Sequence, residues 1–204
     1  MNILCIGAHP DDIEFGCGGT LCKMAGPGCR ITLLVLTDGG RGGAAALRRV
    51  EQAAAARLIG ARLIRAGFRD TELPGERALI SAIEDCLRKT CPGMIFTHFY
   101  EDTHQDHCAV SRAVMTAARN ERDILFFEGP TSINFVPTVF SDIGPVIDKK
   151  FELLGCHRSQ LEKTNIPGLC ILEAAKSAAV FRGGQYRVKY AEGFMPQRLS
   201  LPIR

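Results

Sequence analysis

Residues 2–12, Asn-Ile-Leu-Cys-Ile-Gly-Ala-His-Pro-Asp-Asp, join a short apolar run to a cluster of polar side chains. A run of this length and composition predicts a buried strand, and the polar cluster would lie just past its end. Similar runs alternate with helical patterns along the chain. We expect strands near residues 2–8, 30–37, 61–67, 93–98 and 123–128, and helices near 17–26, 44–59, 76–90 and 106–119.

This alternation predicts an α/β, Rossmann-like fold, in which a mostly parallel sheet is flanked by helices on both faces. Strands that are buried on both faces form continuous apolar runs, as they do in this sequence. With 204 residues, the chain is expected to form a single domain over 1–204. In the strand order 3-2-1-4-5 the first and fourth strands are neighbours, and ligands bind at their carboxyl ends.

The clearest predicted helix covers residues 44–59 and ends at Gly60. Its apolar side chains recur at helical spacing: Leu47, Val50, Ala54 and Leu58. Its charged residues, such as Arg48 and Glu51, are typical of a solvated face. Before it, the Gly- and Ala-rich residues 39–46 suit a mobile active-site loop. After residue 128 the pattern is weaker, and we expect a β segment within 134–142 and helices near 143–154 and 169–181.

Composition indicates what kind of partner the protein binds and in which cellular compartment it works. The net charge is only +3, and no Lys/Arg run resembles a nucleic-acid arm or a membrane-binding patch, so we expect a small-molecule partner. The nine cysteines are odd in number and form no CxxC pair, which indicates free thiols in a reducing compartment. We expect no signal peptide or membrane span, and hence a cytoplasmic protein that could form a homo-oligomer.

Two polar clusters carry the chemistry, one after the first predicted strand and one after the fourth. The second cluster runs from Thr97 to His107 and contains His98, Asp102, His104, Asp106 and His107. His9, Asp12 and His107 offer two nitrogens and one oxygen, which is the ligand set of a catalytic zinc with an open position. Asp11, His104 and Asp106 remain for proton transfer. Histidines at a strand end are more often structural, so His98 is left out of the ligand set, and His157 is open between a structural and a substrate-facing role.

Other interpretations compete with a zinc hydrolase. Gly16, Gly18 and Gly19 invite a comparison with dinucleotide-binding proteins, but a phosphate-binding turn needs its glycines directly after the strand. These glycines suit close packing of a helix against the sheet. A non-catalytic nucleotide-binding or regulatory module would not need Asp11 beside a full ligand set. Phosphoester hydrolysis usually needs two metal ions.

At these residues the chain resembles the PIG-L/LmbE-like family of metal-dependent N-deacetylases. The resemblance rests on the Ala-His-Pro-Asp-Asp segment at 8–12 and the Asp-x-His-x-Asp-His segment at 102–107. Shorter similarities follow through nearly the whole chain, including Thr37-Asp38-Gly39, Arg48-x-x-Glu51, Asn134-Phe135, His157-x-Ser159-Gln160 and Tyr190-Ala191-Glu192. The chain departs from some members at two positions: Ile13 precedes Glu14, and Asp102 stands where those members have a tyrosine.

The resemblance implies a zinc-dependent hydrolase that removes an N-acetyl or similar acyl group from an amino sugar or its conjugate. It implies one Zn²⁺ on His9, Asp12 and His107, although other divalent metals are compatible with these ligands. Asp11 would be the general base. Protonated His104, oriented by Asp106, would polarise the amide oxygen. In thiol-sugar deacetylases of the family, residues at the positions of Arg48 and Asp70 contact the substrate.

Overall fold

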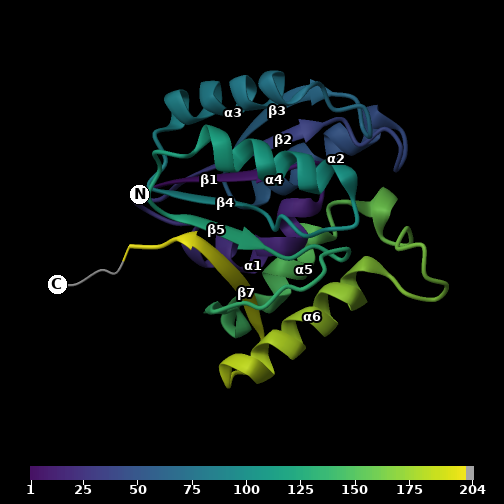
Figure 1. The fold of residues 1–204 in the computed structure, drawn as a ribbon. Helices are drawn as coiled ribbons and strands as arrows, with labels where there is room; N and C mark the ends of the chain where they lie inside the picture. Colours follow the sequence, from purple (N-terminus) through teal and green to yellow (C-terminus); the bar gives the residue numbers. More distant parts are fainter. Residues whose placement is uncertain (201–204) are drawn as a thin grey trace.

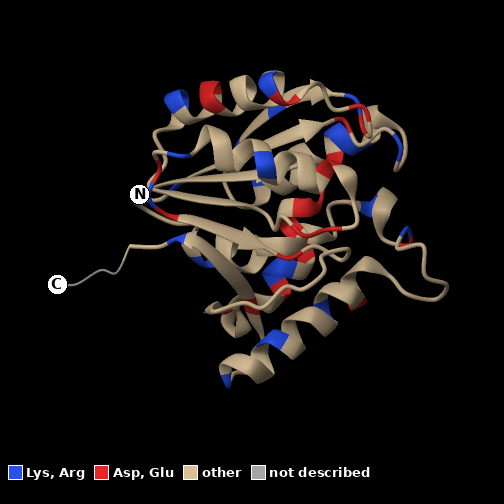
Figure 2. Cartoon of the chain, in the orientation of Figure 1, with Lys and Arg blue, Asp and Glu red and all other residues tan. Residues whose placement is uncertain are grey.

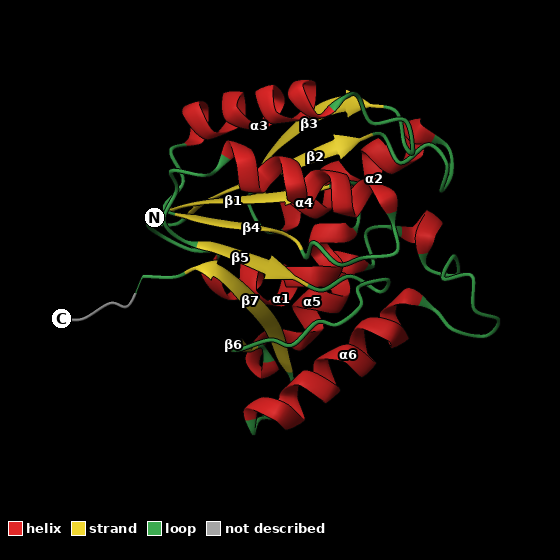
Figure 3. Ribbon diagram, viewed as in Figure 1, coloured by secondary structure: helices red, strands yellow, loops and turns green. Residues whose placement is uncertain are grey.

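The computed structural model describes residues 1–200 and contains a seven-stranded sheet with helices on both faces (Figures 1 and 3). The elements in chain order are β1 (Asn2–Gly7), α1 (Asp12–Met24), β2 (Arg30–Thr37), α2 (Ala45–Leu58), β3 (Arg62–Phe68), α3 (Glu76–Thr90), β4 (Met94–His98), α4 (Gln105–Ala117), β5 (Ile124–Phe127), β6 (Val139–Asp142), the 3₁₀ helix η1 (Gly144–Val146), α5 (Ile147–Leu154), the 3₁₀ helix η2 (Arg158–Gln160), α6 (Ile171–Tyr186) and β7 (Ala191–Arg198). All five strands predicted up to residue 128 are confirmed.

The strand order is β3-β2-β1-β4-β5-β7-β6, which contains the predicted order 3-2-1-4-5. The first five strands are parallel, whereas β7 pairs antiparallel with both β5 and β6. The fold is therefore the expected mostly parallel α/β sheet. Strand β7 is absent from the sequence prediction because Gly193, Pro196 and its polar residues interrupt the apolar pattern by which buried strands are identified.

Two apolar cores cover the two faces of the sheet. Alternate residues of β1 enter different cores: Leu4 and Ile6 pack against α3 and α4, whereas Ile3 and Cys5 pack against α1 and α2. Because both faces of the central strands are buried, β1 is apolar throughout. Its polar neighbours can lie only at its ends, and this concentrates the functional residues at the carboxyl edge of the sheet.

Helix α1 begins at Asp12, five residues before the predicted start at residue 17. Glycine has a low helix propensity, and Gly16, Gly18 and Gly19 all lie in this helix. In the structure, tertiary packing outweighs this propensity: a Cβ at Gly16 would lie 2.2 Å from the ring of Phe127 on β5. The glycines thus allow close approach of α1 to the sheet, as the sequence indicated. This packing places the first turn of α1 beside the ends of β1 and β4.

Helix α2 has the predicted extent, but the predicted orientation of its faces is wrong. Val50 is 63% exposed, and Leu47 and Leu58 are also exposed. Arg48, Glu51 and Gln52 are instead buried, together with alanines of the same helix. The polar residues have partners elsewhere in the fold, which periodicity alone does not reveal. The charged face of α2 therefore belongs to the interior beside the site.

A buried ion pair supports the middle of α1. Lys150 of α5 contacts Glu192 of β7 and donates to the carbonyl oxygens of Glu14 and Phe15. The Glu192 carboxylate accepts hydrogen bonds from the backbone N–H groups of Gly19 and Thr20. Helix α1 is therefore anchored from the C-terminal part of the chain. Among the helices of residues 1–200, none combines the length and apolar character that crossing a bilayer requires.

Candidate metal centre

The polar residues that follow β1 and β4 meet because these two strands are parallel neighbours. His9 leaves the end of β1, and His104 is the N-cap of α4, with Asp106 and His107 in its first turn. Figure 2 shows several Asp and Glu positions grouped around this carboxyl edge of the sheet. Topology alone thus joins two segments that lie about ninety residues apart in the sequence.

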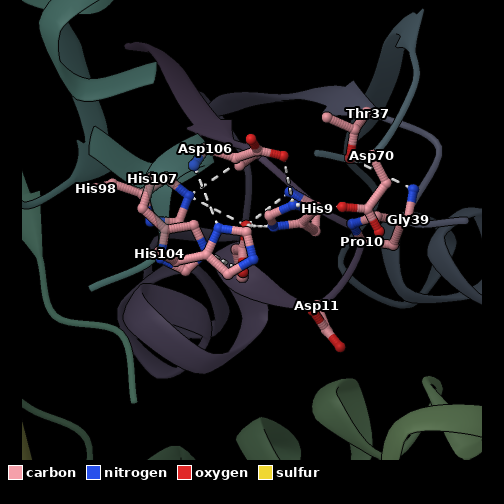
Figure 4. A network of polar contacts seen from close by, with 12 residues as sticks. His9, Pro10, Asp11, Thr37, Gly39, Asp70, His98, His104, Asp106 and His107 are labelled. Carbon is pink, nitrogen blue, oxygen red and sulfur yellow. Dashed lines mark hydrogen bonds and ion pairs between the residues drawn. The ribbon is translucent and has the colours of Figure 1, made fainter. Parts of the chain in front are cut away.

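The strained backbone of Asp11 directs its carboxylate away from that of the next residue, Asp12. Asp11 has a φ of 95°, a left-handed conformation that residues with a Cβ rarely adopt. The side chain of Asp11 points away from the imidazoles (Figure 4), and Arg48 Nη2 donates to its Oδ2 at 3.0 Å. Asp12 becomes the first residue of α1, and its carboxylate contacts the histidines. The two carboxylates therefore face different surroundings.

The Asp12 carboxylate lies between the predicted histidine ligands. Its Oδ2 is 3.3 Å from His9 Nδ1, and its Oδ1 is 3.4 Å from His107 Nε2. Ring nitrogens of His9, His104 and His107 also lie within 4.8 Å of one another. Burial raises the pKa of Asp12, but the neighbouring histidines, His107 foremost, outweigh burial and hold this pKa well below its ordinary value. An anionic carboxylate between two imidazoles is a donor set that suits a divalent metal.

His98 also reaches this cluster, although sequence reasoning left it out of the ligand set. Its Nε2 lies 3.1 Å from Asp12 Oδ2 and accepts the backbone N–H of Ala8 at 3.0 Å. Its ring stacks on His107 with centroids 4.1 Å apart. Burial and the charge of His107 lower the pKa of His98 to about 4, so the ring is neutral. Because Nε2 already has a donor, we keep His98 as a packing partner of the ligands.

Three carboxylates converge on His9. Its Nε2 lies 3.1 Å from both Asp70 Oδ1 and Asp106 Oδ2, while Asp12 contacts Nδ1. Burial lowers the pKa of His9, but these carboxylates outweigh it and raise the pKa to about 12. The His9 imidazole therefore stays protonated beside these carboxylates. This excess of buried negative charge fits a divalent ion, which takes nitrogen and oxygen donors and neutralises neighbouring carboxylates.

The expectation that Asp106 orients His104 through its carboxylate is wrong. The Asp106 carboxylate contacts His9 and accepts the backbone N–H of Thr71 at 2.9 Å. Only the backbone N–H of Asp106 reaches His104, and it donates to Nδ1 at 3.2 Å. Burial and the neighbouring His9 and His107 lower the pKa of His104, which favours a neutral ring over the expected protonated one. With Nδ1 an acceptor, the neutral ring carries its proton on Nε2.

Asp102 supports His107 from behind, a role that sequence reasoning missed. Asp102 Oδ2 lies 3.1 Å from His107 Nδ1, and the carboxylate also accepts the Thr131 hydroxyl at 2.6 Å and the backbone N–H of His104 at 2.8 Å. Burial raises the pKa of Asp102, but these hydrogen bonds outweigh it and lower the pKa to about 2. A carboxylate on the far nitrogen of a ligating histidine fixes its orientation and raises its basicity. The signal in the sequence was an acidic residue inside the second polar cluster.

We predict that Asp102→Asn weakens metal binding by about 10- to 100-fold, the usual cost of losing such an outer carboxylate. The amide keeps the volume of the side chain but removes the charge that faces His107. Competition with a chromophoric chelator would measure the metal affinity. Glu101→Gln is the matched control, because the Glu101 carboxylate accepts a hydrogen bond from the exposed Asn134 side chain, away from the histidines. Equal metal affinity in Asp102→Asn and the wild type would contradict the assignment.

Arg48 and Asp70, the expected substrate contacts, are both buried. Arg48 donates to the carbonyl oxygens of Gly39 and Pro10 and to the Asp11 carboxylate. Asp70 contacts His9 and accepts the backbone N–H of Arg41 at 2.9 Å. These partners favour roles in holding Asp11 and His9 over direct contact with a substrate. Arg48 also ties the Gly-rich loop of residues 39–44 to the first polar cluster.

Comparisons with known proteins agree with this fold. A family model described as PIG-L, GlcNAc-PI de-N-acetylase, matches residues 4–118, which contain both polar clusters. The uncharacterized deacetylase YaiS of Escherichia coli is 37% identical over 151 residues, covering 70% of this chain and 82% of that protein. The diacetylchitobiose deacetylase of Thermococcus kodakarensis is 32% identical over 230 residues, covering 96% and 83%. The crystal structure of the conserved protein TT1542 from Thermus thermophilus superposes with a TM-score of 0.85 at 28% identity, covering 98% of this chain and 96% of that one.

Proposed function

Because the chain belongs to the PIG-L family, we propose that it is a zinc-dependent N-deacetylase. Its reaction is hydrolysis of the N-acetyl, or a similar N-acyl, amide of an amino sugar or amino-sugar conjugate. One observation carries the proposal: two histidines and a carboxylate from the ends of β1 and β4 converge amid an excess of buried negative charge. A deacetylase that acts on diacetylchitobiose is among the relatives, which supports an acetylated sugar as the substrate class.

The metal ligands in this proposal are His9, Asp12 and His107. Asp12 touches both histidines, and Asp102 occupies the far nitrogen of His107. By distance alone His104 is also within reach, but its Nδ1 already accepts the N–H of Asp106. A divalent ion at this site supplies Lewis acidity. The remaining chemistry belongs to the side chains around it.

Asp11 is the general base and His104 is the oxyanion donor. Burial raises the pKa of Asp11 to about 6, against the opposing charge of Arg48, so the carboxylate can accept a proton near neutral pH. Water attacks the amide carbonyl as Asp11 takes one of its protons. The neutral His104 ring donates Nε2–H to the oxygen that becomes negative. The C–N bond then breaks, and the amine leaves after it receives a proton from Asp11 or His104.

The alternative is a non-catalytic nucleotide-binding or regulatory module. The position after β1, where such a module has glycines that meet phosphates, holds His9, Asp11 and Asp12 here. Carboxylates at this position repel a phosphate, which argues against this alternative. All nine cysteines are free, which supports the proposal of a cytoplasmic enzyme.

Acetate release from a panel of N-acetylated amino sugars, including N,N'-diacetylchitobiose, tests the function. The protein is stripped with a chelator and reloaded with Zn²⁺ or other divalent ions. We expect loss of acetate release on stripping and recovery at about one zinc per chain, since one ligand set holds one ion. No acetate from any member of the panel, combined with stoichiometric nucleotide binding, would favour the alternative. Recovery that needs two ions per chain would contradict the single site.

A further inference from the structure

A chain of buried hydrogen bonds ends on the strained backbone of Asp11. The N–H of Asp11 donates to Gln52 Oε1 at 3.2 Å, and Gln52 Nε2 donates to Glu14 Oε1 at 2.7 Å. Gln52 and Glu14 are each only 1% exposed. Gln52 lies on α2 and Glu14 on α1, so the chain also joins the two helices. Asp11 lies at its end with a φ of 95°.

Beyond Glu14 lies a buried histidine that makes an ion-pair contact with its carboxylate. His157 is fully buried, and its Nε2 lies 3.5 Å from Glu14 Oε2. Neither ring nitrogen has a hydrogen-bond partner among residues 1–200. Burial lowers the pKa of His157, but Glu14 outweighs burial and raises it, so the ring balances the carboxylate. Sequence reasoning left His157 open between two roles, and this contact identifies it as a partner of Glu14.

The segment that carries His157 is itself fixed to α2. The backbone N–H and the hydroxyl of Ser159 both donate to the Glu51 carboxylate, at 2.8 and 2.6 Å. Glu51 and Gln52 are consecutive residues of α2. Glu51 binds the segment that carries His157, and Gln52 binds the backbone of Asp11. Gln52 and its partners therefore have little freedom to move. The arrangement is rigid at the point where a strained residue needs support.

A glutamine suits this position because of its two functional groups. One amide oxygen accepts the N–H of Asp11 while the amide nitrogen of the same group donates to Glu14. A carboxylate could only accept, and it would face the Glu14 carboxylate. An apolar side chain would leave the Asp11 N–H without this acceptor. The carboxylate would replace the hydrogen bond to Glu14 by repulsion and so displace the acceptor of the Asp11 N–H, whereas the apolar side chain would remove that acceptor altogether.

We propose that Gln52 is a positioning residue that holds Asp11 in its left-handed conformation and thereby keeps the Asp11 and Asp12 carboxylates in their separate surroundings. This inference rests on the proposed function, in which Asp11 moves the proton and Asp12 holds the metal. The polar contacts of Gln52 are with Asp11 and Glu14. It acts through the backbone of Asp11, with Glu14 and His157 behind it.

Exchanging the amide of Gln52 and the carboxylate of Glu14 between the two positions tests the proposal in the zinc-loaded enzyme. Gln52→Glu should lower kcat by about 10²-fold, as expected for a misplaced reacting group, with KM unchanged. Zinc content should stay at the wild-type value. The double variant Gln52→Glu/Glu14→Gln restores one amide and one carboxylate in facing positions, and it should regain most of the lost kcat. Gln197→Glu makes the same chemical change at an exposed position of β7 and serves as the control.

A second variant covers the case in which Gln52→Glu does not fold. Gln52→Met keeps the length but carries no charge and no donor, and its sulfur is only a weak acceptor. It should show the same loss in kcat at unchanged KM. Wild-type kcat in Gln52→Met, or no recovery in the double variant, would overturn the inference. Asp11→Asn separates the two proposals. If it loses activity while the Gln52 variants keep theirs, only the inference fails, whereas full activity in Asp11→Asn would refute the proposed role of Asp11.

Discussion

Replacing His107 with alanine is expected to remove the metal and to abolish amide hydrolysis while the fold remains. His107 lies in the first turn of α4 and contacts Asp12 through Nε2. Without its nitrogen, His9 and Asp12 keep only two donors, too few for a stable zinc site. Lewis-acid catalysis contributes several kcal/mol to such reactions, and its loss lowers kcat/KM by about 10³-fold or more.

Three measurements on the purified His107→Ala protein check this expectation. Elemental analysis gives the zinc content per chain, and acetate release gives kcat/KM. Met115→Ala is the matched control, because Met115 lies on the same helix with an exposed side chain. The circular dichroism spectrum should be that of the wild type, since the imidazole lies at the edge of the core. A variant that retains one firmly bound zinc would remove His107 from the ligand set.

The sequence predicted the sheet well because burial on both faces leaves an unambiguous pattern. The apolar runs that form β1, β2 and β4 have the length and continuity of buried strands. The order of strands and helices along the chain then restricts the possible topologies. The face of α2 was mispredicted because Arg48, Glu51 and Gln52 have partners on distant segments. Hydropathy describes the polarity of a side chain, but it does not show whether that side chain will have a polar partner inside the folded protein.

The same limit explains what was missed in the site. His9, Asp12 and His107 stand in compact motifs, and topology brings those motifs together. Asp102 and Gln52 act through contacts with a ring or a backbone N–H that only the folded chain defines. The expected pairing of Asp106 with His104 failed for a related reason. Proximity in sequence suggested it, whereas the helical turn directs the Asp106 carboxylate to His9.

Asp11→Asn should separate proton transfer from metal binding. The variant keeps the shape of the side chain and a hydrogen-bond acceptor for Arg48, so the left-handed turn should persist. Zinc content should remain at the wild-type value, because Asp12 supplies the oxygen donor. Activity should fall by about 10²-fold or more, the usual contribution of a general base. Asp12→Ala should instead lose zinc and activity together.

The pH profile adds an independent test of the same role. A general base works in its ionised form, so wild-type activity should rise with pH through the pKa of Asp11 and then level off. In the metal-free protein this pKa is about 6, raised by burial. A nearby divalent cation stabilises the ionised carboxylate, so the limb in the zinc-loaded enzyme should lie below pH 6. Asp11→Asn should lack this limb, whereas Asp85→Asn, an exposed change on α3, should keep it. An unchanged acid limb in Asp11→Asn would assign the base to another group, because a residue that cannot titrate cannot produce it.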